Sequence, residues 1–474
     1  MIRGPGKTVV SHGDEGDHVA DLDAQLDQLE ASAVLSGCRV IRLSVEDPPP
    51  IDLVSELAAA LASPREAPPL NVLAQGCHSV VIITSDGTRA TPSHAMMGPV
   101  MEELARGGIS PDAVRVVIGV GVHRPATPGE IVDLLGAEWA ARLTVSSHDA
   151  CAADLVEVGR TGHGTPVLLN RLVAQADLRI AFGQVEPHEF AGFTGGRKAI
   201  LPAVVGCETI VRNHALEMLR SPSARPGVLT RNPIHEDMLS AARLAGLHFI
   251  VNVALDRDLR PIAVAAGDME AAHDYLVAFL RRHLELSAPA SSPAVIVTGP
   301  GRPLDINLYQ TVKALVGIEP LLDVDYGLAA HPVVVLLSRC WDGTGSEEMF
   351  EPFCAAEGSD ARAPGAGKSS GKHALSELAL AALEHDFSIE KDESYYIARV
   401  TPKCSRVVAW CPGVSDRRLT TLGWEPAKDA SSALSQALDV SRGADTGWTE
   451  GPAEPPLVLL CPRPQRALFV PPDA

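Results

Sequence analysis

The segment "EPHEFAGFTGGRKAILP", residues 186–202, carries more reactive side chains than a structural loop requires. Its imidazole, His188, follows a proline, which restricts the backbone before it. The Lys198 amine stands beside the cation Arg197, and a neighbouring cation together with partial burial favours the neutral, nucleophilic form of an amine. The segment also holds three glycines, which allow the backbone to approach a bulky or anionic group closely: Gly192, Gly195 and Gly196.

A second imidazole, His214, follows sixteen residues after Lys198 in "VRNHAL", on a predicted helix. A single histidine of this kind is more often a structural residue than a ligand. Histidine is nevertheless both a general acid/base near neutral pH and a common metal ligand. Taken together, His188, Lys198 and His214 around a glycine-rich loop favour a reactive site.

A second candidate, "TSDGTRATPSH", follows the predicted strand 79–84 and contains Asp86, Gly87, Thr88 and Arg89. In open α/β sheets, ligands bind at the carboxyl ends of strands, and helix N-termini attract anions. An arginine there can bind a carboxylate or phosphate through two hydrogen bonds. The alternative is a capped turn with a solvent-exposed arginine.

The next predicted strand, 114–120, is followed by "GVGVHRPATPGE", which places His123 and Arg124 in the turn. The helix after this turn begins with a capping box, Thr127 and Glu130. A His-Arg pair in a turn is commonly surface decoration. Polar side chains at two successive strand ends favour a site instead.

A fourth candidate follows the predicted strand 294–298 in "GPGRPLDINLYQTVKAL". If a helix begins near Asp305, Tyr309 and Lys313 are one turn apart and share a face, with Gln310 beside them. A surface lysine at the start of a helix is the alternative.

The elements that must position these residues are short apolar runs without alternation, typical of parallel strands buried on both faces. Such runs occupy 79–84, 114–120, 178–182, 248–255, 294–298, 332–337 and 406–410. Helical segments separate several of them, which indicates an α/β fold with mainly parallel sheets. The polar stretch 284–293 predicts two domains, 1–285 and 286–474, with an active-site cleft between them. We expect residues 355–372 to form a mobile insertion and the C-terminal tail to pack back on the first domain.

Composition limits the partners. The chain has 474 residues and a formal net charge of −19, which argues against a nucleic-acid binder. Its nine cysteines form no C-x-x-C pair, which favours reduced thiols in the cytoplasm. No apolar run approaches the length of a membrane span, so we expect no membrane association.

These motifs together resemble the lactate racemase family. The resemblance covers residues 80–350 and includes "CWDGTGSEEMF" at 340–350. Members of that family use a nickel-pincer nucleotide, a pyridinium mononucleotide whose two thiocarboxyl arms hold Ni(II) through S, C and S. The resemblance therefore implies an isomerase that racemises or epimerises a small 2-hydroxy acid by hydride transfer, together with separate enzymes that make the cofactor.

The resemblance also implies a role for each motif residue. Lys198 would be joined covalently to the cofactor and His214 would be the fourth nickel ligand. His123 and His188 would be the proton donors and acceptors. Nucleotide contacts would come from the turn after the first strand: Asp86, Gly87, Thr88 and Arg89. Substrate contacts would come from Arg89, Tyr309, Gln310 and Lys313.

The chain departs from the family pattern at Ala90, where many relatives carry proline, and at Ala203, where glycine is common. The resemblance therefore does not identify the 2-hydroxy acid, and the sequence leaves racemisation or epimerisation open. Two other functions remain open as well. They are a non-catalytic nickel-nucleotide carrier or sensor, and a lysine-dependent Schiff-base enzyme.

Overall fold

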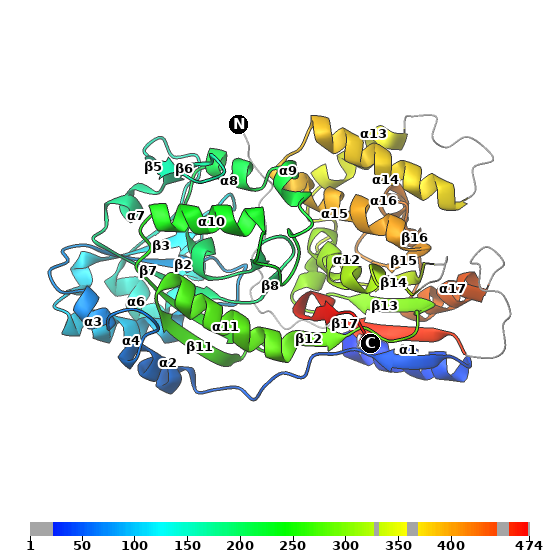
Figure 1. Ribbon diagram of the computed structural model, residues 1–474, viewed down its shortest axis with the longest axis horizontal. Coiled ribbons are helices and arrows are strands. Elements are labelled where there is room, and N and C mark those ends of the chain that lie inside the picture. The colour runs from blue at the N-terminus through cyan, green and yellow to red at the C-terminus, as the bar shows by residue number, and fades with distance from the viewer. Residues whose placement is uncertain (1–21, 327–330, 358–367, 443–454, 473–474) are drawn as a thin grey trace. The chain divides into compact units, whose positions relative to one another are not determined.

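The computed structural model describes residues 22–326, 331–357, 368–442 and 455–472. Within them the chain forms two compact units (Figure 1). The first comprises Glu46–His283, and the second comprises Leu284 onward together with the segment that ends at Val45. Each unit is built around a six-stranded sheet. The predicted α/β fold with mainly parallel sheets is confirmed.

The sheet of the first unit has the strand order β11-β10-β7-β2-β3-β4. Its pairs are parallel except β10 with β11. The strands are β2 Val80–Ser85, β3 Val114–Gly119, β4 Thr144–Ser147, β7 Leu178–Gln184, β10 Phe249–Leu255 and β11 Pro261–Gly267. Because β7, β2 and β3 are parallel neighbours, the segments that follow them emerge at one edge of the sheet.

Helices and two small hairpins complete the first unit (Figure 1). The helices are α2 Leu53–Ala62, α3 Leu70–Leu73, α4 Ser93–Arg106, α5 Pro128–Leu135, α6 Ala137–Arg142, α7 Arg171–Gln175, α8 Cys207–Asn213, α9 Leu216–Leu219, α10 Pro233–Leu244 and α11 Met269–Leu284. The hairpins pair β5 Val156–Arg160 with β6 Pro166–Leu169, and β8 Pro187–His188 with β9 Gly192–Phe193. The predicted capping box at α5 is present, with Thr127 and Glu130 each capping the other.

The sheet of the second unit is parallel throughout, with the order β1-β17-β13-β14-β15-β16. Its strands are β1 Arg39–Arg42, β13 Val295–Gly299, β14 Val333–Leu337, β15 Arg406–Trp410, β16 Glu425–Pro426 and β17 Leu457–Pro462. A further pair joins β12 Glu285–Ser287 to β18 Leu468–Val470. Its helices are α1 Leu22–Leu35, α12 Leu308–Leu322, α13 Glu351–Glu357, α14 Lys368–His385, α15 Asp392–Val400, α16 Asp416–Thr421 and α17 Ala430–Arg442.

Two features of the predicted domain organisation differ from the structure. Helix α1 and strand β1 belong to the second unit, where Leu22, Leu26 and Leu29 enter its apolar core. The C-terminal segment belongs to the second unit, where β17 forms a central strand of the sheet, between β1 and β13. Of the predicted insertion, residues 355–357 end α13 and 368–372 begin α14, while 358–367 lie outside the described residues.

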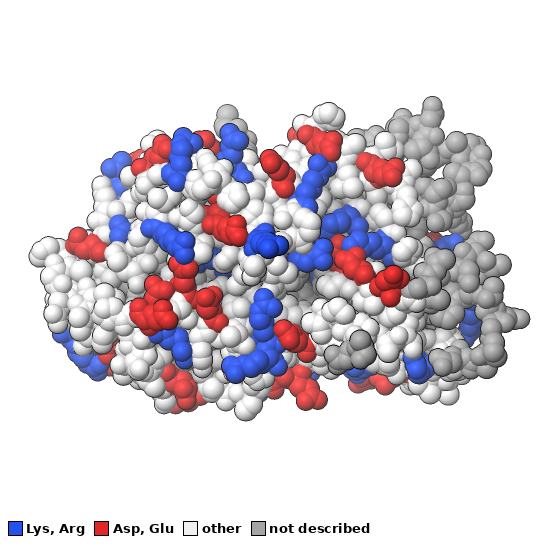
Figure 2. Space-filling model, in the orientation of Figure 1, with Lys and Arg blue, Asp and Glu red and all other residues white. Residues whose placement is uncertain are grey.

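The surface carries charges of both signs, and acidic and basic side chains are interspersed on the face shown in Figure 2. Within the described ranges, no helix has both the length and the apolar composition needed to cross a bilayer.

Candidate active site

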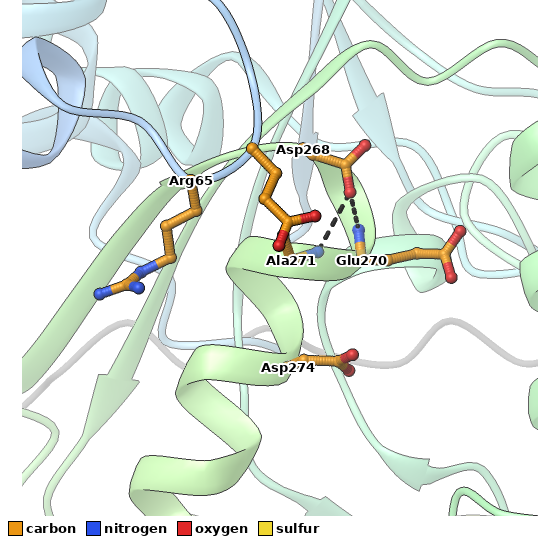
Figure 3. Close-up of a pocket in the computed structure, with 6 residues that line it drawn as sticks. Arg65, Asp268, Glu270, Ala271 and Asp274 are labelled. Atoms are coloured by element: carbon orange, nitrogen blue, oxygen red, sulfur yellow. Dashed lines mark hydrogen bonds between the residues drawn. The ribbon is translucent and has the colours of Figure 1, made fainter.

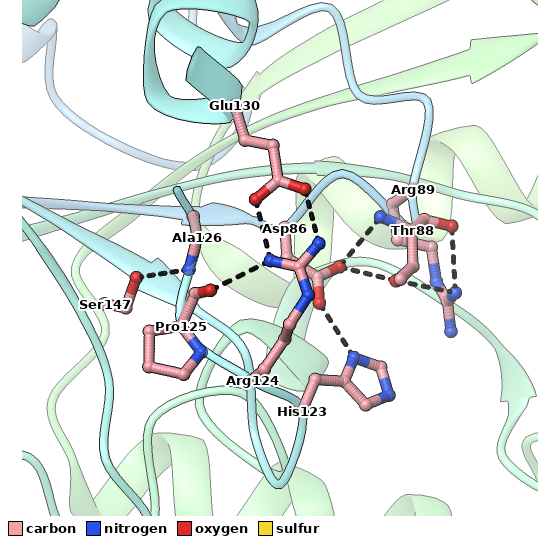
Figure 4. Close-up of polar contacts among 9 residues, drawn as sticks. All are labelled: Asp86, Thr88, Arg89, His123, Arg124, Pro125, Ala126, Glu130 and Ser147. Atoms are coloured by element: carbon pink, nitrogen blue, oxygen red, sulfur yellow. Dashed lines mark hydrogen bonds and ion pairs between the residues drawn. The ribbon is translucent and has the colours of Figure 1, made fainter. Parts of the chain in front are cut away.

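The residues predicted after β2 and β3 meet at the edge of the first sheet (Figure 4). His123 Nδ1 lies 2.7 Å from Asp86 Oδ2. Because a carboxylate only accepts hydrogen bonds, Nδ1 of the neutral imidazole carries the proton and Nε2 keeps its lone pair. About one third of the His123 side chain is exposed. This arrangement presents a basic nitrogen to a ligand from an imidazole whose orientation is fixed.

Asp86 is buried, yet it remains a carboxylate. Burial acts to raise its pKa, but the hydrogen bond and charge of His123 and the hydrogen bond from Thr88 outweigh burial, and the pKa is lowered. The Thr88 backbone N–H also donates to Asp86 Oδ1, at 3.1 Å. The turn therefore folds around Asp86, while Gly87 and Thr88 themselves are exposed.

The two arginines of these turns have different surroundings (Figure 4). Arg124 makes two hydrogen bonds to Glu130, of 2.9 and 2.6 Å, and these bonds are the main cause of the lowered Glu130 pKa, about 2. Arg124 thus fixes the start of α5. Arg89 is half-buried, and its guanidinium donates to Thr88, over 3.2 Å to the carbonyl oxygen and 3.5 Å to the hydroxyl.

The segment after β7 brings His188 and Lys198 into contact. Lys198 Nζ lies 3.0 Å from His188 Nε2, and the Glu189 carboxylate lies 3.3 Å from His188 Nδ1. His188 is buried, and Lys198 and Glu189 are half-buried. The imidazole therefore lies between an anion and a cation.

His214 joins this cluster through the ring of Phe190. The ring centroid of Phe190 is 4.5 Å from that of His188 and 5.0 Å from that of His214, with an edge-on geometry in both pairs. Lys198 Nζ lies 5.3 Å from the same centroid. The structure thus brings together His188, Lys198 and His214, as the sequence predicted.

His214 caps the C-terminus of α8, where its Nδ1 lies 3.0 Å from the Ile210 carbonyl oxygen. Because a carbonyl only accepts, Nδ1 carries the proton and Nε2 has the lone pair. Burial, with the charge of Lys198, lowers the pKa of His214 to about 3. The imidazole is therefore neutral, which is the form that binds a metal.

A buried polar network holds the end of α8. The Asn213 amide donates to Asp237 Oδ2 over 2.9 Å, and Thr165 donates to the same oxygen over 2.9 Å. Thr161 donates to the other carboxylate oxygen. Asp237 is fully buried, and these bonds satisfy its carboxylate while they fix the residue that precedes His214.

The glycines of the segment have a different role from the predicted one. All three have positive φ, and protein atoms fill the space beside each of them. A Cβ on Gly192 would lie 2.4 Å from the Val228 carbonyl oxygen, and one on Gly195 would lie 2.8 Å from Asn252 Oδ1. Gly196 packs against the ring of His273. The glycines therefore allow the loop to pack closely against other parts of the chain. This packing explains their presence without a ligand.

Arg197 also has a structural role. Its guanidinium is fully buried and donates to the carbonyl oxygens of Ala191, at 2.7 Å, and Phe193, at 2.9 Å. Burial lowers the Arg197 pKa to about 9, so the side chain stays charged at neutral pH. Arg197 holds the loop that carries Lys198, a role that the sequence did not reveal.

Two departures from the family pattern can be located. Ala203 packs against the end of β3, because a Cβ on Gly119 would lie 2.6 Å from the Ala203 Cβ, and the Gly121 N–H donates to the Ala203 carbonyl over 3.1 Å. The loop that carries Lys198 is thereby joined to the turn that carries His123. Ala90 is half-buried, and nothing in the structure explains that residue.

Three of the predicted substrate residues, Tyr309, Gln310 and Lys313, lie in the second unit, whereas Arg89 lies in the first. Helix α12 begins at Leu308, capped by the side chain of Asn307, which accepts from the Gln310 N–H. Tyr309 and Lys313 therefore lie one turn apart, as predicted, and the Tyr309 hydroxyl donates to Asp392 over 2.8 Å. Tyr309, Gln310 and Lys313 are all half-buried.

A pocket of about 660 Å³ lies elsewhere in the first unit, at the start of α11 (Figure 3). It is lined by Arg65, Glu66, Asp268, Glu270, Ala271 and Asp274. Asp268 caps the helix by accepting from the N–H groups of Glu270 and Ala271. None of the predicted site residues lines this pocket.

Sequence reasoning missed two residues beside the site. Glu189 adjoins His188, and its place next to a candidate histidine was a usable signal. His148 follows β4 and is buried, with Nε2 at 2.9 Å from the Val205 carbonyl oxygen and Nδ1 at 3.2 Å from the Asn170 amide. Its partners are distant in sequence, so no local pattern identifies it.

Comparisons with known proteins show the family of the chain. Residues 34–227 match the lactate racemase N-terminal domain model and residues 288–446 match the C-terminal domain model. A lactate racemase of Lactiplantibacillus plantarum is 39% identical over 293 residues, which are 61% of this chain and 67% of that protein. One from Thermoanaerobacterium thermosaccharolyticum is 36% identical over 297 residues, 62% of this chain and 67% of that protein.

Solved structures give the same result. The lactate racemase apoprotein of Thermoanaerobacterium thermosaccharolyticum superposes with a TM-score of 0.76 at 27% identity, over 91% of this chain and 94% of that one. A protein of Thermotoga maritima shares the fold, with a TM-score of 0.58 at 14% identity over 90% and 100% of the two chains. From both domain matches and the relatives at 36–39% identity, this chain belongs to the lactate racemase family.

Proposed function

We propose that the protein is a nickel-dependent racemase or epimerase of a small 2-hydroxy acid. Family membership supports this activity. The observation that carries the proposal is the cluster in which Lys198 Nζ contacts His188 Nε2 at 3.0 Å while His214 lies on the same phenylalanine ring. This cluster combines an amine for attachment, a metal ligand and a proton carrier.

The residues fit a nickel-pincer nucleotide. His214 offers one neutral imidazole nitrogen, and its Nδ1–H is held by a backbone carbonyl, as is typical of a metal-binding histidine. Within the described residues, no group of three or more His, Cys, Asp and Glu side chains could hold a metal ion. The nucleotide would supply the remaining nickel donors, and His214 would add the imidazole. Lys198 is the attachment point, and the bound group supplies the hydride acceptor.

The two histidines would carry the protons. Racemisation of a 2-hydroxy acid requires a base to take the hydroxyl proton of either enantiomer and to return it. His123 Nε2 is free of the Asp86 contact, and Asp86 stabilises the imidazolium that forms when this nitrogen accepts a proton. Glu189 stands in the corresponding place beside His188. Each histidine therefore has a carboxylate near Nδ1, which suits two bases that serve two substrate orientations.

Attachment of the cofactor would change the surroundings of His188. An amine that becomes part of an amide-type bond loses its positive charge and two of its hydrogens. Lys198 would then no longer contact His188 as a cation. We propose that covalent loading removes this ammonium contact from His188 Nε2.

The remaining predicted residues are proposed to bind the ligands. The turn Asp86–Arg89 would contact the nucleotide, and the Arg89 guanidinium would also approach the substrate carboxylate. Gln310 and Lys313 would hold the substrate oxygens, with Tyr309 beside them, kept in place by its bond to Asp392. We further propose a cytoplasmic location, cofactor-synthesis enzymes as partners, and no binding of nucleic acid or membranes.

The activity is tested with protein co-produced with the cofactor-making enzymes. Single enantiomers of a panel of 2-hydroxy acids are incubated with the loaded protein, and optical activity is followed. We expect at least one substrate to lose optical activity with the loaded protein. With the Lys198→Arg variant, the optical activity of that substrate should not change. A loaded protein that racemises or epimerises no member of the panel contradicts the proposal and favours a carrier or sensor.

A further inference from the structure

Two thiols of the first unit lie in contact. Cys151 Sγ and Cys207 Sγ are 3.2 Å apart, although the residues are 56 positions apart in the chain. Cys151 is exposed and Cys207 is half-buried, so a small reagent can reach this pair. The nine cysteines of the chain, all within the described residues, are free thiols.

The backbone holds these thiols face to face. The Cys207 N–H donates to the Ala150 carbonyl over 3.0 Å, which joins the peptide next to Cys151 directly to Cys207. On the other side, the Cys151 N–H donates to the Asp149 carboxylate over 2.9 Å. Gly206, which precedes Cys207, donates to the Leu168 carbonyl over 2.8 Å. Backbone hydrogen bonds therefore hold the two cysteines next to each other.

We propose that Cys151 and Cys207 form a reversible disulfide when the protein meets a peroxide. The sulfur atoms must approach from 3.2 Å to about 2.05 Å, a change of about 1.2 Å that side-chain rotation can supply. An adjacent pair of thiols, one of them exposed, is the arrangement found in redox-responsive sites. This proposal is independent of the nickel cofactor.

The chemistry balances with hydrogen peroxide as the oxidant. The Cys151 thiolate attacks a peroxide oxygen: an S–O bond forms, the O–O bond breaks, and the departing hydroxide takes a proton to become water. The Cys207 sulfur then attacks the Cys151 sulfur, so that the S–S bond forms and the S–O bond breaks. The departing hydroxide takes the Cys207 proton and forms a second water. Two thiols lose two electrons, and one peroxide is reduced to two waters.

The environment assigns the order of attack. Burial, followed by the contact with Cys151, raises the pKa of Cys207 to about 11, so Cys207 holds its proton at neutral pH. The exposed Cys151 is therefore the thiol that reacts with peroxide, and Cys207 resolves the product.

The bond would join two parts of the site's framework. Cys207 begins α8, the helix that ends next to His214, and Cys151 lies in the segment after β4, close to His148. The closed loop would contain the whole segment 186–202. Oxidation would thus tie the start of α8 to the sheet edge without using any residue proposed to bind substrate.

The test uses the reduced, full-length protein without cofactor. It is treated with a small excess of hydrogen peroxide and the intact protein is weighed; the remaining thiols are then alkylated, and the peptides are weighed. We expect a loss of about 2 Da, two fewer alkylated thiols, a peptide containing Cys151 joined to one containing Cys207, and reversal by dithiothreitol. If both thiols are still alkylated, or if Cys151 is oxidised to sulfinic acid without a link, the proposal is wrong.

Two serine variants sharpen the result. Cys207→Ser should abolish the 2 Da loss and leave Cys151 as a sulfenic or sulfinic acid. Cys77→Ser is the matched control, because Cys77 is a half-buried thiol of the same unit that donates to the Leu73 carbonyl. That variant should form the link at the wild-type rate. A link that persists in Cys207→Ser, or one that joins other cysteines in the wild type, overturns the assignment.

Discussion

The amine of Lys198 lies 3.0 Å from Nε2 of His188, the nitrogen that we propose as a proton carrier. The Glu189 carboxylate lies 3.3 Å from the opposite nitrogen, Nδ1. In the protein without cofactor, His188 therefore lies between the Glu189 carboxylate and the Lys198 amine. Attachment of the cofactor to Lys198 would remove its ammonium group from His188. Loading of the protein would therefore change the surroundings of the histidine that we propose as a proton carrier.

Loss of either histidine should remove a proton carrier. In loaded protein we expect His123→Ala and His188→Ala each to lower turnover by roughly 10²–10⁴-fold, the usual scale for a lost general acid/base. Initial rates of racemisation in both directions provide the measurement. His94→Ala is the control, because His94 is an exposed residue of α4 outside the proposed site. Near-normal rates in both site variants would remove these histidines from their roles.

Asp86 should affect turnover because it stabilises the protonated form of His123. Asp86→Asn keeps the size of the side chain but removes the charge that stabilises the imidazolium, and we expect a loss of turnover of roughly 10²-fold or more. Asp133→Asn, an exposed carboxylate on α5, should leave turnover unchanged.

The contact between Asp86 and His123 also predicts how the stability of the protein depends on pH. The folded pKa of Asp86 is lowered, so its contribution to stability is present above the ordinary aspartate pKa of about 4 and is lost as the pH falls through the folded value. Urea unfolding should therefore show wild type and Asp86→Asn converging in stability at acidic pH. A constant difference between them down to low pH would contradict this assignment.

His148 should also make stability depend on pH, over a higher pH range than Asp86. Burial lowers its folded pKa, whereas the unfolded side chain titrates near 6.5. Below about pH 6.5 the unfolded state binds the extra proton, so the free energy of unfolding decreases as the pH falls. Because other buried histidines add to the total, the diagnostic quantity is the difference between variant and wild type.

We expect His148→Gln to lower the free energy of unfolding by about 1–3 kcal/mol at neutral pH, because the buried groups that bond to His148 lose good hydrogen-bond geometry. Between pH 6.5 and 5 the variant should lose stability less steeply than the wild type. His163→Gln changes an exposed histidine of the same unit and should follow the wild-type curve. Parallel curves for His148→Gln and wild type would show that His148 does not titrate on unfolding.

The glycine at position 192 should tolerate no side chain. Its φ is +76°, and an added Cβ would lie 2.4 Å from the Val228 carbonyl oxygen. The strained conformation and the clash predict a loss of roughly 2–4 kcal/mol for Gly192→Ala, measured by urea unfolding. Gly162→Ala, where no heavy atom lies within 4 Å of the added Cβ, should change stability little. Equal stability of the two variants would show that the loop can shift to make room.

The buried strands were predictable because burial on both faces leaves an unbroken apolar run, as in β2, β3 and β14. Strand β1 was not, because it has four residues, two of them arginines, and its partner β17 lies at the far end of the chain. The apolar run "LVLLCP" of β17 was a usable signal of a strand, although it is absent from the predicted runs.

The candidate site was predictable to the extent that each residue stands in a local motif. His188, Lys198 and His214 belong together because the spacing of the glycine-rich segment and α8 is short. The purpose of the glycines was not predictable, because their neighbours Val228, Asn252 and His273 come from distant parts of the chain. For the same reason, the anchoring role of Arg197 depends on packing that no motif records.

The central claim, that Lys198 and His214 hold a nickel nucleotide, is tested most directly by weighing the intact protein after co-production with the cofactor-making enzymes, together with nickel analysis. We predict a mass increase equal to the nickel nucleotide, located on the peptide that contains Lys198, with about one nickel per chain. Lys198→Arg should lack the adduct, and His214→Ala should keep the adduct but lose most of the nickel. An unmodified Lys198 without nickel, or an imine trapped there by borohydride, would contradict the account.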